Sequence, residues 1–175
     1  GARRMEEYVR SARKQLLQQS EEKKYSVNDE ISQCVRIFEY KARKNKAVIN
    51  FDAEGRIFTS GDPLNFNQVI SNLISNAIDS FDALEDDRKR SVNVSLSYGG
   101  GSVRIQVEDN GRGISEKDKE KIFQPFFTTK PVEKGTGIGL NNCKKIVEEL
   151  MGGRIWFESE EGRGTKFFFE FPHKT

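Results

Sequence analysis

The sequence has few of the residues on which disulfide-rich, zinc-binding and membrane proteins depend. Its two cysteines, Cys34 and Cys143, lie far apart and outside any Cys/His cluster. A disulfide framework or a zinc site therefore has little support, and a reducing compartment fits better. No apolar run reaches the roughly 18 residues of a membrane span, and the first residues lack the apolar core of a signal peptide. We therefore expect the chain as given to be soluble.

The chain also has little net charge and only one histidine. Lys and Arg outnumber Asp and Glu by 29 to 27, which gives a net charge of +2. This balance indicates neither a nucleic-acid partner nor an anionic membrane, so any anion site has to be local. The one histidine, His173, follows the last predicted strand and is interpreted as a tail or vector residue.

The sequence does contain enough apolar surface for one core, since 35% of its residues are hydrophobic and 13 are Phe. Its length of 175 residues fits one domain with an appendage. The appendage is residues 3–24, where Met5, Val9 and Leu16 form a thin apolar stripe on a predicted long helix. This narrow stripe belongs either to a solvated surface helix or, as we favour, to half of a helical hairpin or coiled coil.

The rest of the chain changes repeatedly between strand-like and helical patterns. Alternating residues predict strands at 25–27, 47–51, 92–96, 103–107, 154–158 and 166–171. Helical spacing predicts helices from the N-cap Asn28 to about Ala42, from Asp62 to Phe81, near 117–123 and over 140–151. Together these elements predict an α/β (α+β) two-layer sandwich, in which three helices cover one face of a mixed, mostly antiparallel sheet.

Three polar side chains interrupt the most apolar of the predicted helices. Asn72, Asn76 and Asp79 stand at i, i+4 and i+7, so they share one helical face among apolar neighbours. One interpretation is a set of core polar groups with satisfied hydrogen bonds. The other is a site for Mg²⁺, which takes oxygen ligands and shares phosphate oxygens.

A glycine-rich turn follows the predicted strand 103–107. Its Asp109-Asn110-Gly111 sequence is compatible with an ordinary turn. A carboxylate fixed at a strand end can instead accept a hydrogen bond from the exocyclic amine of a purine. Gly111 and Gly113 would then let the flat base approach the backbone.

Two further motifs, Phe123–Lys130 and Gly135–Leu140, lie between this turn and the helix predicted at 140–151. Unpaired N–H groups and the positive end of a helix dipole suit phosphate oxygens, although a loop with a good cap is the other interpretation. No strand precedes the glycines, as a Rossmann fingerprint requires, and GxxxxGK[ST] is absent. The sequence therefore excludes a P-loop protein.

In their order, the motifs from Tyr25 to Pro172 resemble those of the ATP-binding catalytic domain of sensor histidine kinases. Asn72–Asp79 resembles the N box, Asp109–Gly113 the first G box, Phe123–Phe127 the F box, Gly135–Leu140 the second G box, and Gly162–Thr165 the closing strand motif. The Phe126–Lys130 stretch is most similar to the nitrogen-regulation type. The resemblance implies the Bergerat ATP-binding fold, shared with type II topoisomerase, Hsp90 and MutL ATPases.

The resemblance implies ATP and Mg²⁺ as cofactors and carries roles over residue by residue. Asn76 would bind Mg²⁺, and Asn72 would help hold the metal and phosphates. Lys130, the third implied catalytic residue, would contact phosphate. Asp109 would bind the adenine amine, and residues 114–136 would form a mobile lid anchored by three phenylalanines. The implied cofactor-binding residues are Asn72, Asn76, Asp79, Asp109, Gly111, Gly113, Ile114, Phe123, Phe126, Thr129, Lys130, Gly135, Thr136, Gly137, Ile138, Gly139, Leu140 and Thr165.

The sequence departs from this family at two points. Many relatives carry a basic residue three positions after the metal-binding Asn, where this chain has Asp79, so Lys130 or Lys134 would have to supply the positive charge. No histidine lies in a helical phosphoacceptor context. Residues 1–24 resemble only the second helix of a dimerisation hairpin, and residues 25–175 would form the catalytic domain. The acceptor histidine is thus expected outside this chain.

The implied function is transfer of the ATP γ-phosphoryl group to a histidine on the hairpin of a homodimeric, cytoplasmic parent kinase, for relay to a response regulator. Membrane anchorage of the parent is left open. A regulator that binds nucleotide without transferring phosphate is one alternative, against which the intact metal and glycine motifs argue. A MutL-like clamp and an anti-sigma serine kinase are two others. The F box argues against the clamp, and the helix before the domain argues against the anti-sigma kinase.

Overall fold

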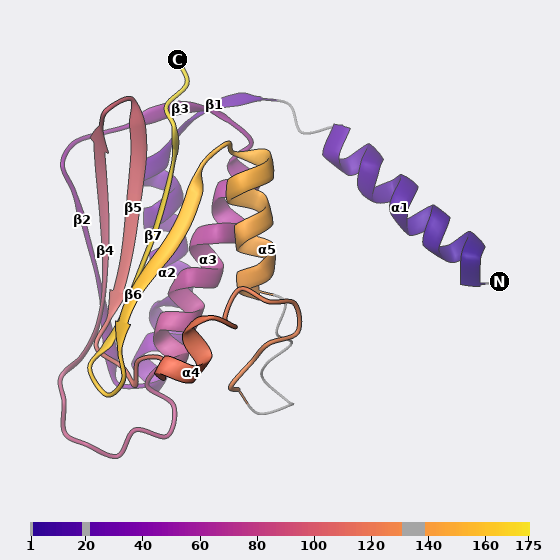
Figure 1. Ribbon diagram of the computed structural model, residues 1–175. Helices are drawn as coiled ribbons and strands as arrows, with labels where there is room; N and C mark the ends of the chain where they lie inside the picture. The colour runs from indigo at the N-terminus through magenta and orange to yellow at the C-terminus, as the bar shows by residue number, and fades with distance from the viewer. Residues whose placement is uncertain (1, 19–21, 131–138) are drawn as a thin grey trace.

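The computed structural model describes residues 2–18, 22–130 and 139–175. A five-stranded sheet forms one layer, and helices α2, α3 and α5 cover one of its faces (Figure 1). This arrangement confirms the predicted two-layer α/β sandwich. In chain order the elements are α1 (Ala2–Gln18), β1 (Lys23–Ser26), α2 (Val27–Lys44), β2 (Ala47–Ala53), β3 (Phe58–Gly61), α3 (Pro63–Asp79), β4 (Arg90–Gly99), β5 (Ser102–Asp109), α4 (Glu116–Lys119), α5 (Gly139–Lys145), the π-helical turn η1 (Ile146–Leu150), β6 (Arg154–Glu160) and β7 (Gly164–Pro172).

The strand order of the main sheet is β2-β4-β5-β7-β6, and only β2 and β4 pair in parallel. The sheet is therefore mixed and mostly antiparallel, as predicted. The parallel pair arises because the chain leaves β2, forms α3 on one face of the sheet and returns beside β2 as β4, which is a crossover connection. Gly100 and Gly101 take positive φ angles of 60° and 78° and close the β4–β5 hairpin.

Helix α3 is the centre of the core. It starts as predicted, because the Asp62 side chain accepts a hydrogen bond from Leu64 N and Pro63 occupies the first turn. Burying each of its large apolar side chains contributes about 1.5–3 kcal/mol, which fixes the helix against the sheet. The polar face with Asn72 and Asn76 is thereby held in a defined place. The buried residues of α3 are Phe66, Val69, Ile70, Leu73, Ile74, Ala77, Ile78 and Asp79.

The C-terminal residues are bound to the domain, so His173, interpreted as a tail or vector residue, is not a loose tail, and a vector origin stays a prediction. His173 N donates to Gly101 O (2.9 Å), and its Nε2 lies 2.7 Å from Phe58 O. Lys174 O accepts a hydrogen bond from Ser60 N of β3 (3.0 Å). Strand β3 was not predicted, because this short, partly polar strand pairs with β1 and bonds to these distant C-terminal residues.

Several predicted helix ends are also wrong. Ser26 rather than Asn28 is the N-cap of α2, because the Asn28 side chain bonds instead to Ile57 N and Gly55 O. The helix predicted over 140–151 ends in the π-helical turn η1, where Leu150 is 48% exposed. The first helix ends at Gln18, and Lys23 already belongs to β1.

Three apolar side chains in the first half of α1 are exposed. Met5, Tyr8 and Val9 are 70%, 80% and 61% exposed. Among the helices that the structure describes, none combines the length and the apolar character needed to cross a membrane.

Candidate functional site

A cavity of about 680 Å³ lies between α3, the turn after β5, α4 and the start of α5. This volume is in the range of about 300–1,000 Å³ that is usual for small-molecule sites. The cavity brings together motifs that lie far apart in the sequence. The predicted site residues that line it are Asn72, Asn76, Asp109, Gly113, Ile114, Thr129, Lys130, Gly139, Leu140 and Thr165.

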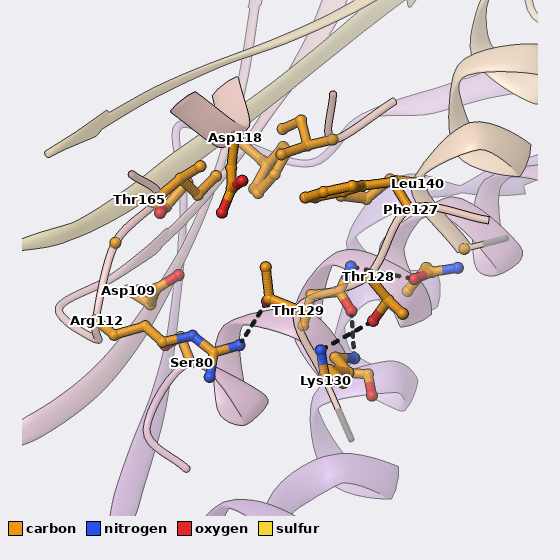
Figure 2. A pocket seen from close by; sticks show the side chains of 18 of the residues that line it. Ser80, Asp109, Arg112, Asp118, Phe127, Thr128, Thr129, Lys130, Leu140 and Thr165 are labelled. Carbon is orange, nitrogen blue, oxygen red and sulfur yellow. Dashed lines mark hydrogen bonds between the residues drawn. The ribbon is translucent and has the colours of Figure 1, made fainter. Parts of the chain in front are cut away.

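One end of the cavity is built around a buried carboxylate. Asp109, the last residue of β5, is 6% exposed, and its Oδ1 accepts a hydrogen bond from Gly111 N (2.9 Å). The residue paired with Asp109 on the neighbouring strand β7 is Thr165, which is 5% exposed. Figure 2 shows both side chains at the end of the cavity away from Lys130. Burial raises the pKa of Asp109 from 3.8 to about 6, so near neutral pH this end offers an ionised acceptor to a hydrogen-bond donor.

Two glycines let the turn after β5 pack closely on its neighbours. A Cβ at Gly111 would lie 1.9 Å from Ser80 Oγ at the end of α3. A Cβ at Gly113, whose φ is +69°, would lie 2.2 Å from Glu160 O in the β6–β7 hairpin. Both positions therefore require glycine. Gly111 does not line the cavity, but it sets the position of the turn that does.

Arg88 ties this turn to the β6–β7 hairpin. Its Nη1 donates to the carbonyls of Asn110 (2.8 Å), Gly111 (3.0 Å) and Gly162 (3.0 Å). Asp86 accepts from the other guanidinium nitrogens and orients the side chain. No local pattern in the sequence indicates this clamp, because the carbonyls that Arg88 binds are 22 to 74 residues away.

The other end of the cavity holds the two asparagines of α3. Asn76 Nδ2 donates to Asn72 Oδ1 (3.3 Å), which leaves Asn76 Oδ1 to accept from Lys130 Nζ (2.9 Å). A Cβ at Gly139 would lie 2.6 Å from Asn72 Oδ1, so α5 starts directly against Asn72. An amide oxygen that already receives an ammonium group at a cavity wall also fits a divalent cation that bridges to phosphate oxygens.

Asp79 lies beside this end but does not line the cavity. It is 8% exposed, and its two carboxylate oxygens pair with Lys41 Nζ (2.7 Å) and Lys130 Nζ. Burial alone raises the pKa of Asp79, but hydrogen bonds from Lys130 and Lys41 outweigh it and hold the pKa below its usual value. Asp79 therefore stays ionised and is neutralised by two lysines.

The F box contributes its phenylalanines unequally. Phe123 packs against Phe157 and Phe167, with ring centroids 5.9 and 6.4 Å apart, and its carbonyl accepts from Asn141 Nδ2 (3.1 Å). Phe127 is partly buried against the core, but Phe126 is 78% exposed. Phe126, whose backbone φ is +64°, is therefore not an anchor of the lid in this structure. Lys134, Gly135, Thr136, Gly137 and Ile138 lie outside the described residues.

Other residues of the cavity wall gave no functional signal in the sequence. Arg112 Nη2 donates to Thr129 Oγ1 (3.2 Å). This bond joins the turn after β5 to the F-box segment, Phe123–Lys130, across the cavity (Figure 2). Ser115 Oγ is buried without a hydrogen-bond partner among the described residues and is available to a ligand. The Ser-x-x-Asp pattern at 115–118 is a helix-start signal that could have located this residue. The remaining lining residues are Gln68, Ser75, Ser80, Lys117, Asp118, Ile122, Phe127, Thr128, Asn142, Glu161 and Phe167.

The raised pKa of Asp109 predicts opposite effects of acid on stability and on ligand binding. Because its folded-state pKa lies above the unfolded value, its contribution to stability is fully present below about pH 4 and is lost as the pH rises through about 6. The empty protein should gain up to about 3 kcal/mol from this group between pH 7 and pH 4 relative to Asp109→Asn. Purine binding should weaken over the same interval. Urea unfolding and nucleotide titration at several pH values measure both effects, and parallel pH profiles for the two proteins would contradict the assignment.

Known proteins that resemble this chain in sequence include histidine kinases and related ATPases. Residues 61–175 match the family described as histidine kinase-, DNA gyrase B-, and HSP90-like ATPase. Sensor protein TdiS of Thauera aromatica is 36% identical over 110 residues, which are 62% of this chain and 20% of that protein. Sensor histidine kinase ZraS of Escherichia coli K12 is 33% identical over 147 residues, which are 83% of this chain and 30% of that protein. The chain thus spans less than a third of these curated relatives.

Solved structures show the same fold. The nucleotide-free catalytic domain of histidine kinase ThkA superposes with a TM-score of 0.74 at 35% identity, covering 88% of this chain and 97% of that one. The complex of ThkA with response regulator protein TrrA superposes with a TM-score of 0.70 at 28% identity, covering 98% of this chain and 49% of that one. With its cavity built from the N, G and F boxes, the chain belongs to the histidine kinase-, DNA gyrase B- and HSP90-like ATPase family, as the ATP-binding catalytic domain of a sensor histidine kinase.

Proposed function

We propose that this domain binds ATP together with Mg²⁺ and donates the γ-phosphoryl group to a histidine on a dimerisation hairpin. The observation that carries the proposal is the polarity of one cavity. A buried carboxylate, Asp109, faces one end, whereas the amide oxygen of Asn76 and the ammonium group of Lys130 meet at the other. A purine nucleotide is complementary to this cavity, because it carries hydrogen-bond donors on the base at one end and negative charge on the phosphates at the other.

In this proposal the domain's own residues bind and orient the nucleotide. Asp109 accepts from the adenine amine, Asn72 and Asn76 hold Mg²⁺ and phosphates, and Lys130 contacts a terminal phosphate. The metal, when bound, neutralises charge that develops on the transferred group. Positioning and charge neutralisation account for most of the catalysis of phosphoryl transfer, so no nucleophilic side chain is needed in this domain. The acceptor is the imidazole of another segment.

We further propose that the domain is of the nitrogen-regulation type. Its N box carries Asp79 where many relatives carry a basic residue, and Lys130 from the Phe-Phe-Thr-Thr-Lys stretch reaches the same place. A positive charge supplied by the F-box segment supports this subfamily, because the terminal phosphates need a cation there.

The proposed partners are a histidine-bearing hairpin of the parent kinase and a response regulator. Helix α1 with its exposed Met5, Tyr8 and Val9 supports the hairpin, because such a stripe is stabilised by a second helix. In this reading α1, Ala2–Gln18, belongs to the second helix of the hairpin, in a homodimeric parent kinase in the cytoplasm. The ThkA structure that was solved with its response regulator supports the second partner by analogy.

A phosphotransfer assay tests the proposal. The chain is mixed with radiolabelled ATP, Mg²⁺ and the separately produced hairpin of its parent protein, and label on the hairpin is followed with time. We expect label that is acid-labile and base-stable, as for phosphohistidine, and none with a hairpin whose histidine is replaced by Gln. Nucleotide binding without any transfer would favour the regulator that binds ATP and acts through its partners. No binding of nucleotide at all would remove both readings.

A further inference from the structure

Two lysines from different parts of the fold share the carboxylate of Asp79. Lys41 Nζ, from the last turns of α2, lies 2.7 Å from Oδ1, and Lys130 Nζ, from the F-box segment, binds Oδ2. Lys130 also donates to Asn76 Oδ1 (2.9 Å). The side chain of Asp79 is only 11% exposed, so water screens its charge poorly. The three charged groups therefore form one unit with a net charge of +1.

Binding of Mg-ATP has to rearrange this unit, which is where the inference rests on the proposed function. A metal ion on Asn76 Oδ1 would bring two cations to one amide oxygen, and their repulsion favours movement of Lys130 away from it. Two anions then compete for the Lys130 ammonium group: the Asp79 carboxylate and the terminal phosphate. How firmly Asp79 holds Lys130 depends on what else neutralises Asp79.

Lys41 is placed to neutralise Asp79 from the frame of the domain. Its Nζ also donates to Ser75 Oγ (2.8 Å), and Ser75 is a wall residue of the cavity. Helix α2 is fixed by buried Ile31, Val35 and Ala42, so Lys41 keeps its place whatever the F-box segment does. We propose that Lys41 is a positioning residue for ATP: by holding Asp79, it releases Lys130 to the terminal phosphate.

The consequence is a selective effect on the γ-phosphate. Without Lys41, Asp79 keeps Lys130 for itself and leaves a buried negative charge beside the triphosphate. ATP, which needs Lys130 at its terminal phosphate, loses affinity, whereas ADP, which lacks that phosphate, is little affected. Loss of a merely structural contact between α2 and α3 would weaken both nucleotides alike. The ratio of the ADP and ATP dissociation constants therefore separates the two roles.

Calorimetric titration of a non-hydrolysable ATP analogue and of ADP, both with Mg²⁺, tests the proposal. We expect Lys41→Met to weaken the ATP analogue about tenfold and ADP less than about twofold. Lys44→Met is the matched control, because Lys44 lies on the same helix. Its ammonium group lies over the ring of Tyr40 (4.8 Å) and has no ion pair with the described residues. It removes the same charge from α2 and should leave both affinities unchanged. Lys41→Arg should keep most of the selectivity.

Asp79→Asn completes the test, because it removes the competitor for Lys130. Alone it should leave the preference for the ATP analogue unchanged or raise it, and in its background Lys41→Met should have no further effect. Equal weakening of both nucleotides by Lys41→Met would overturn the proposal, as would an undiminished effect of Lys41→Met in the Asp79→Asn background. If Lys41→Met does not fold, a lower preference for the ATP analogue in Asp79→Asn alone overturns it. Absence of nucleotide binding by the unaltered chain would instead refute the proposed function, and the inference with it.

Discussion

Replacing Asp109 by Asn is expected to weaken adenine nucleotide binding about 100-fold or more. The carboxylate is 6% exposed and sits where water cannot take over its role as an acceptor. Asn presents an NH₂ group in place of one acceptor oxygen, so two donors face each other when the adenine amine enters. A lost hydrogen bond to a charged group and an unpaired buried donor together cost about 3 kcal/mol or more. Calorimetric titration of ADP with and without Mg²⁺ measures the loss.

Glu108→Gln is the control for Asp109→Asn. Glu108 precedes Asp109 in β5 but points to the opposite face of the sheet, where its side chain is 40% exposed. It removes one negative charge from the same strand and should leave binding within about twofold of the unaltered chain. An Asp109→Asn protein that is folded and binds ADP normally would show that the base lies elsewhere.

Replacing Asn76 by Ala is expected to remove the dependence of nucleotide binding on Mg²⁺. Asn76 Oδ1 is the amide oxygen of the N box that faces Lys130 in the cavity, and Ala offers no ligand in its place. The affinity for the ATP analogue at saturating Mg²⁺ should fall about 10- to 100-fold, which corresponds to about 1.5–3 kcal/mol for a bond to a charged group. Affinity without Mg²⁺ should change much less, and phosphotransfer to the hairpin should stop.

Asn67→Ala is the matched control for Asn76→Ala. Asn67 is an asparagine of the same helix, accepts from Ser71 Oγ (3.2 Å) and does not line the cavity. Its replacement tests the effect of losing an amide from α3 without touching the site. Binding by Asn76→Ala that keeps its full Mg²⁺ dependence would place the metal on other ligands.

Local pattern was sufficient to predict the elements that build the cavity. The helical spacing of apolar residues in α3, with Asp62 and Pro63 at its start, is a strong signal because it lies within one element. The alternation of apolar residues in β4 and β5 is also a signal within single elements. Glycines were a further signal, since a Cβ at these positions would meet backbone or an adjoining side chain. Strand β3 was missed because its stability comes from residues distant in sequence.

Contacts between elements could not be predicted in this way. Arg88 clamps the carbonyl of Gly162, 74 residues away, and a charged loop carries no sign of such a partner. The exposure of Phe126 depends on how its segment lies against the rest of the domain, which the composition of the F box does not set. Charge at single positions was equally uninformative, since Asp79 alone predicts repulsion of a triphosphate.

The sequence by itself determined the family and the order of the motifs, because short-range spacing and residue chemistry are written along the chain. Only the tertiary structure decided how the charges at the Lys130 end of the cavity are arranged. Lys41, Asp79 and Lys130 come from α2, α3 and the F-box segment, and their attraction depends on distances that packing alone sets. The hydrophobic burial of α3 and α2 determines those distances, so the balance of charge at this site is a property of the fold.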